Sequence, residues 1–88
     1  MPQARQRSPA HHTQAVRAAI EAMDGTIVMA RALVEGGRRI DLAGLDGETG
    51  RLCAAVMALD GAEARRLRPA LESLRRQVDG LASRLATD

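Results

Sequence analysis

Apolar residues recur with helical spacing along the first long segment of the chain, roughly Thr13 to Glu35. Two sets of positions advance by alternating steps of four and three residues, which is the period of one helix face. The first stripe consists of Val16, Ile20, Met23, Ile27, Ala30 and Val34. The second stripe lies beside it and consists of Ala15, Ala19, Ala22, Thr26, Met29 and Leu33. Such a wide face lets a helix touch two neighbours, so this helix is predicted to be the centre of the fold.

Glycines set the expected limits of this helix. Gly25 falls on the outer side and costs about 1 kcal/mol relative to Ala. The first stripe keeps its period across Gly25, which favours one continuous helix. The competing interpretation is a turn at Asp24-Gly25 between two shorter helices. Gly36-Gly37 ends the helix, because Gly accepts the left-handed conformation common at helix C-termini.

A second, shorter helix is predicted over 47–59, with Asp46 as its N-cap. Its apolar period consists of Thr49, Leu52, Val56 and Leu59. An earlier start at Asp41 is disfavoured, because three glycines would then lie inside the helix at about 1 kcal/mol each. These glycines are Gly44, Gly47 and Gly50. Residues 40–46 are therefore predicted to form an ordered loop whose large side chains close the end of the bundle, namely Ile40, Leu42 and Leu45.

A third helix is predicted from Asp60, a capping residue, with Glu63 placed to complete a capping box. Its apolar period is the most regular in the chain and consists of Ala64, Leu67, Leu71, Leu74, Val78, Leu81 and Leu85. Pro69 lies inside this segment but on the outer face, so the helix is predicted to be kinked and continuous to about Ala86.

The pattern as a whole predicts an all-α fold, an antiparallel three-helix bundle with two long helices and one short helix. Residues 13–88 form a single helical domain in this prediction. Residues 1–12 have no apolar period and are predicted to be a disordered tail that folding does not need, including the adjacent His11 and His12.

Composition makes the expected core a thin one. The chain has 88 residues and no Phe, Trp or Tyr, and a single core of about 70–80 residues supplies only about 3–5 kcal/mol. Cys53 is the only cysteine, so an internal disulfide cannot add to this. Self-association at micromolar concentration, or a bound partner, is therefore predicted to contribute stability.

Candidate chemistry is sparse. The sequence shows no metal-ligand spacing and no nucleophile–base set, so we expect no enzyme activity, no metal and no cofactor. Cys53 can act as a reactive thiol or as a small buried hydrophobe, and the second interpretation is favoured because no His accompanies it. We expect a cytoplasmic protein, since there is no signal peptide and no apolar run of about 18 residues.

Charge does not favour nucleic acid. The chain has 13 basic and 11 acidic residues, a net charge of +2. Basic residues of the third helix could follow phosphates, or they could form a solvated face balanced by nearby acids. The solvated face is favoured because no aromatic side chain is present to stack on bases. The basic residues concerned are Arg65, Arg66, Arg68, Arg75, Arg76 and Arg84.

The second stripe supplies the candidate binding residues, Ala22, Met29 and Leu33. One narrow stripe on each helix can close a small core, which leaves the second stripe in excess. Excess apolar area on a protein surface usually marks an interaction site. The alternative is that the first helix is central and buries both stripes.

Two long helices joined through a short one, with the capped segment Leu-Asp-Gly-Glu-Thr-Gly-Arg-Leu-Cys at Leu45–Cys53, resemble the small helical proteins of bacterial flagellar operons. These include the export chaperones and adaptors of type III secretion. The resemblance implies a cytosolic protein that binds an amphipathic helix of a secreted subunit. The alternative function is a structural subunit that assembles with copies of itself, and a nucleic-acid-binding regulator ranks below both.

Overall fold

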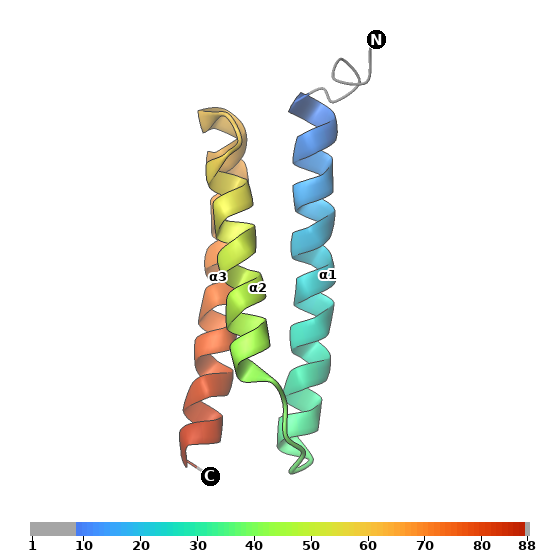
Figure 1. Ribbon diagram of the computed structural model, residues 1–88, viewed down its shortest axis with the longest axis vertical. Coiled ribbons are helices and arrows are strands. Elements are labelled where there is room, and N and C mark those ends of the chain that lie inside the picture. Colours follow the sequence, from blue (N-terminus) through green and yellow to red (C-terminus); the bar gives the residue numbers. More distant parts are fainter. Residues whose placement is uncertain (1–8, 88) are drawn as a thin grey trace.

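The computed structural model describes residues 9–87 of the chain. They form three α-helices, α1 (Pro9–Glu35), α2 (Leu42–Met57) and α3 (Gly61–Thr87). Each helix runs antiparallel to the one before it, and α3 contacts both α1 and α2 (Figure 1). The predicted all-α bundle of two long helices and one short helix is confirmed.

Helix α1 is continuous through Gly25, so the turn considered at Asp24-Gly25 is wrong. It begins at Pro9, where a proline is tolerated because the first N–H groups of a helix have no intrahelical partner. Residues 9–12, predicted as part of the tail, are therefore helical. The remainder of the predicted tail, 1–8, lies outside the described residues.

The C-terminus of α1 closes as the glycines predict. Gly37 has a φ of 81°, a conformation that side chains other than hydrogen disfavour. The Gly37 N–H donates to the Val34 carbonyl at 3.0 Å, and the Arg38 N–H donates to the Leu33 carbonyl at 2.8 Å. These two bonds form a Schellman motif and satisfy carbonyls that the helix end would leave unpaired.

Helix α2 starts five residues earlier than predicted. Its N-cap is Asp41 rather than Asp46, and the Asp41 carboxylate accepts the Gly44 N–H at 2.9 Å. The predicted loop 40–46 is therefore mostly helical. Its apolar side chains do pack against the core as expected, and these are Ile40, Leu42 and Leu45. Burying them outweighs the intrinsic cost of the glycines inside the helix.

Helix α3 begins after Asp60, whose carboxylate accepts the Glu63 N–H at 3.1 Å. The Glu63 side chain pairs with Arg66 at 3.4 Å. The helix continues through Pro69, which is exposed. An outward-facing proline keeps its ring out of the packed interface, which is why the apolar period survives it.

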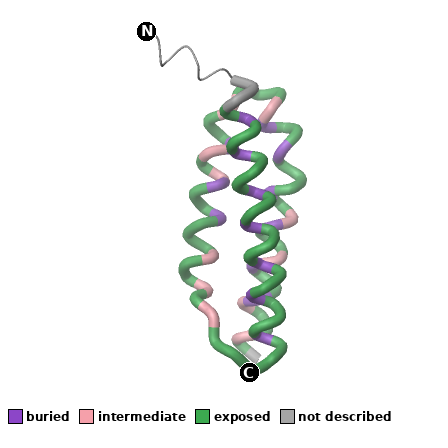
Figure 2. The backbone as a smooth tube through the Cα atoms, turned by 90° about the vertical axis from the view of Figure 1, so that its right-hand side faces the viewer, coloured by how far each residue is buried: buried purple, intermediate pink, exposed green. Residues whose placement is uncertain are grey.

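The core runs along the bundle axis between the three helices (Figure 2). The first stripe is entirely buried, and the largest fully buried side chains are Ile27, Thr49 and Leu74. The Thr49 hydroxyl donates to the Leu45 carbonyl at 2.9 Å, so its polar atom is satisfied within α2. Among the side chains that the structure describes, no buried N or O atom lacks a hydrogen-bond partner.

Candidate functional site

The second stripe lies on the surface along its whole length. All six of its side chains are exposed, with Met29 exposed to 68% and Leu33 to 40%. The alternative in which α1 buries both stripes is therefore wrong. The first stripe supplies the buried apolar side chains of the α1 helix in the core, so the second stripe is excess apolar surface.

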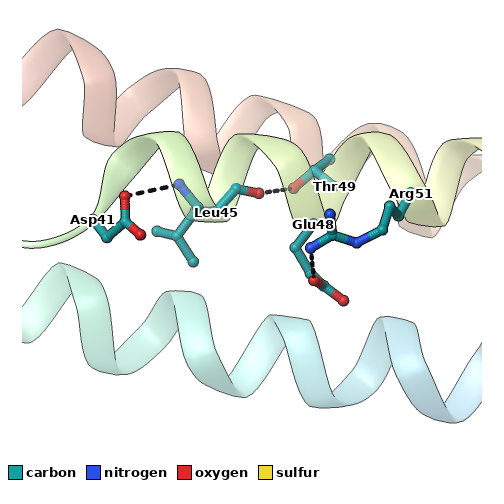
Figure 3. Close-up of polar contacts among 6 residues, drawn as sticks. Asp41, Leu45, Glu48, Thr49 and Arg51 are labelled. Atoms are coloured by element: carbon teal, nitrogen blue, oxygen red, sulfur yellow. Dashed lines mark hydrogen bonds and ion pairs between the residues drawn. The ribbon is translucent and has the colours of Figure 1, made fainter.

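A groove between α1 and α2 extends this surface. It has a volume of about 390 Å³ and is called the α1–α2 groove. Its lining consists of Ala19, Ala22, Met23 and Thr26 of α1 with Gly44, Leu45 and Glu48 of α2. The Leu45 side chain points from α2 toward α1 (Figure 3) and is partly buried. The groove is open and mostly apolar. The α1 side chains that line it are mainly small, which leaves space between the two helices.

The first turn of α2, which Asp41 caps, contributes Gly44 and Leu45 to the lining of the α1–α2 groove. Asp41 folds back over the first turn and accepts the Gly44 N–H (Figure 3). A Cβ at Gly44 would lie 2.5 Å from one Asp41 carboxylate oxygen, so a larger residue here would displace the carboxylate from its capping position. One turn further on, Glu48 at the groove rim pairs with Arg51, and the rim therefore carries a neutral ion pair.

The charges of α1 lie away from the second stripe, and several of them reach α3. Asp24 accepts from the Gln77 side-chain amide at 3.2 Å, and Arg31 donates to the Gln77 side-chain oxygen at 3.4 Å. Glu35 pairs with Arg84 of α3 at 3.7 Å. The second stripe itself contains no charged residue. A partner can therefore cover it without burying an unpaired charge, which would be costly.

Cys53 is half-buried and packs against the core, as the structural interpretation of this residue expects. Nearby, Arg75 of α3 pairs with Asp46 of α2 at 3.5 Å. Cys53, and to a lesser degree Asp46 and Asp79, raise the pKa of Arg75 above its ordinary value. A guanidinium is already charged at physiological pH, so this shift creates no pH-dependent group.

The basic residues of α3 form a mixed face. Arg65, Arg68 and Arg76 are exposed, and Arg66 pairs with Glu63. Glu72 and Asp79 are also exposed on the same helix. This alternation of sign is typical of a solvated surface and weakens attraction to a row of phosphates.

Within residues 9–87 no cluster of His, Cys, Asp or Glu is arranged to hold a metal ion. None of the helices described there is long and apolar enough to cross a membrane. Comparisons with models of protein families, with curated proteins and with solved structures find no match to this chain. The geometry of the described surface is therefore the main basis for a functional proposal.

The predicted binding residues fall on this one surface. Ala22 lines the α1–α2 groove, and Met29 and Leu33 continue the second stripe toward the C-terminus of α1. The sequence prediction missed the contribution of α2, because it treated Gly44 and Leu45 as loop residues. The period that could have revealed them begins at Leu42 and continues through Leu45, Thr49, Leu52, Val56 and Leu59.

Proposed function

We propose that the protein is a non-catalytic binding module that takes an amphipathic helix on the second stripe of α1. One observation carries this proposal. Met29 and Leu33 are large, apolar and exposed on a stripe without charged residues, and that stripe borders the α1–α2 groove. Soluble helices normally place their apolar stripes in the core, so a second exposed stripe indicates a surface that is covered by a partner.

The chemistry of the surface suits a helix better than a polar ligand. An amphipathic helix lays side chains spaced by three and four residues into an apolar groove. The alanines of the second stripe allow the backbone of such a helix to come close, and the flexible Met29 side chain can adapt to its partner. The apolar area removed from water would stabilise the complex by about 25 cal/mol per Å² before the costs of association.

The proposed class of protein is a cytosolic chaperone or adaptor. Its partner would be an amphipathic helical segment of another protein, such as a subunit destined for flagellar export. The resemblance of the helix order and of the Leu45–Cys53 segment to small flagellar-operon proteins supports this class. A chaperone of this kind covers the apolar face of a segment until that segment assembles elsewhere.

A photo-crosslinking residue placed at Met29 in cells tests this proposal. Val28 is the matched control position, since it is a neighbouring apolar residue on α1 that is 56% exposed and lies outside the second stripe. The expected result is an adduct from Met29 to the apolar face of a helix of another protein, identified by mass spectrometry, and its loss in a Leu33→Asp variant. The proposal fails if Met29 captures no more of any other protein than Val28 does.

A further inference from the structure

The side chains of the second stripe are graded in size along α1. Its N-terminal half contains only alanine, at positions 15, 19 and 22, and its C-terminal half contains Thr26, Met29 and Leu33. Every one of these side chains is exposed. A partner that fits this stripe must be bulky opposite the alanines and small opposite Met29 and Leu33.

A second copy of α1 in the antiparallel direction has this shape. When Ala22 is level with Thr26 of the second copy, Ala19 is level with its Met29 and Ala15 with its Leu33. Each large side chain then meets a small one, and a twofold axis repeats all three pairs. A parallel pair would instead place Leu33 against Leu33 and leave the alanines separated by a gap.

We propose that a second copy of this chain covers the second stripe through antiparallel α1–α1 pairing. This inference rests on the proposed function, because it concerns the same second stripe. It names the occupant of that stripe when no helix of another protein is bound. The exposed Met29 of each copy lies over Ala19 of the other, where it fills the α1–α2 groove. Each groove of about 390 Å³ is thus occupied by the partner copy's stripe.

Charge and coverage agree with this arrangement. The second stripe carries no charge, and the one charged residue that lines the groove, Glu48, is paired with Arg51 at the rim, so two copies meet without burying an unpaired charge. The dipoles of two antiparallel helices also oppose one another favourably. The first turn of α2 contacts the groove beside Ala19–Thr26, and Figure 1 shows that α2 begins well short of the C-terminal end of α1. The large residues of the stripe therefore project from a part of α1 that α2 leaves open.

The expected dimer is a weak one. From Ala15 to Leu33 the stripe is about 27 Å long at 1.5 Å per residue, and it is one helix wide. An interface of this extent falls at the small end of specific protein–protein contacts, where weak and transient complexes are found, and we expect a dissociation constant in the micromolar range. Such a dimer would exchange quickly enough for a helical client to displace one copy.

Sedimentation equilibrium of the full chain tests the pairing. Leu33→Asp and Ala19→Glu each place a carboxylate in the contact and are expected to raise the dimer dissociation constant by about tenfold or more. Val28→Asp is the matched control and should leave the dissociation constant unchanged, because Val28 lies about 100° around α1 from Met29. Circular dichroism verifies that each variant is folded. If Leu33→Asp is unfolded, Ala19→Glu decides the question, since Ala19 is an exposed residue of the groove lining and lies outside the core.

Disulfide trapping tests the direction of the pair. In a Cys53→Ala background, Ala19→Cys and Met29→Cys are prepared as separate proteins and oxidised alone or mixed. Antiparallel pairing predicts that the mixture forms a cross-linked dimer, while Met29→Cys alone forms little. Efficient cross-linking of Met29→Cys with itself, or a wild-type chain that stays monomeric up to about 0.5 mM, overturns the inference.

The outcomes separate this inference from the proposed function. A monomeric chain whose Met29 still captures a helix of another protein contradicts the second copy and supports the binding module. A dimer whose Met29 captures only this chain supports the second copy and contradicts the client-binding role. A monomeric chain whose Met29 captures nothing contradicts both.

Discussion

Asp41 and Gly44 act together at the start of α2, and neither can be understood alone. The Asp41 carboxylate accepts the Gly44 N–H at 2.9 Å and lies where a Cβ of residue 44 would be. Glycine at this position therefore lets the Asp41 carboxylate keep its capping geometry. At Gly50 no neighbouring atom calls for glycine, because nothing lies within 4 Å of a Cβ placed there.

This difference predicts opposite effects for two identical substitutions. Gly50→Ala should stabilise the fold by about 0.5–1 kcal/mol, because alanine has the higher helix propensity. Gly44→Ala should give no net stabilisation, since the propensity gain is offset by the loss of an N-cap worth about 1 kcal/mol. Urea denaturation followed by circular dichroism measures both. Equal stabilisation by the two variants would show that the cap is unimportant.

At the scale of the elements, polar side chains join α1 to α3 at one level of the bundle. The Gln77 amide group donates to Asp24 and to Ser73 and accepts from Arg31. Gln77 is partly buried, and its bond to Ser73 is partly buried as well, while its bonds to Asp24 and Arg31 are exposed. They fix how far α1 can slide along α3, which apolar contacts alone specify poorly.

Gln77→Ala is therefore expected to lower the free energy of unfolding by about 1 kcal/mol, within the range for net hydrogen-bond contributions. Gln14→Ala is the control, because Gln14 is an exposed glutamine of α1, and it should change stability little. Both are compared by chemical denaturation. A loss as large for Gln14→Ala as for Gln77→Ala would contradict the linking role of Gln77.

The existence and order of the three helices could be predicted from apolar spacing, because burial of a regular stripe dominates the choice of structure. The start of α2 could not be predicted correctly in this way, because the prediction gave the helix cost of the glycines more weight than the apolar period that begins at Leu42. The candidate binding residues Ala22, Met29 and Leu33 could be selected from the sequence as members of a second stripe. Whether that stripe was buried depended on how α2 packs beside α1, a tertiary property that local spacing does not determine.

The whole molecule is long and thin, with extents of 53, 23 and 16 Å. Its radius of gyration is 15.3 Å, against about 12 Å expected for a compact domain of this length. An elongated shape has much surface for its volume, so few side chains are fully buried. Ile27, Thr49 and Leu74 are the largest of them. These three side chains come from the middle parts of their helices, so we expect the section around them to contribute most to stability.

Leu74→Ala should remove about 2–5 kcal/mol, comparable to the whole stability that one small core supplies. The variant is expected to be largely unfolded at 25 °C by circular dichroism. Leu85→Ala is the comparison, because Leu85 is only partly buried near the end of α3 and should cost much less. A well-folded Leu74→Ala protein would show that stability is spread along the bundle.

Pro69 lies inside α3 and interrupts the main-chain hydrogen bonding of the helix. It has no N–H, so the carbonyl of Arg65 has no main-chain donor four residues ahead. The first two turns of α3 therefore lack one main-chain bond to the rest of the helix, and we expect them to open together with the end of α2 before the rest of the bundle does. Amide protons at the α2–α3 end of the bundle should exchange with solvent through this partial opening. Amide protons around Leu74 should exchange only when the entire chain unfolds. The bundle thus comes apart in a preferred order, from its α2–α3 turn toward its centre.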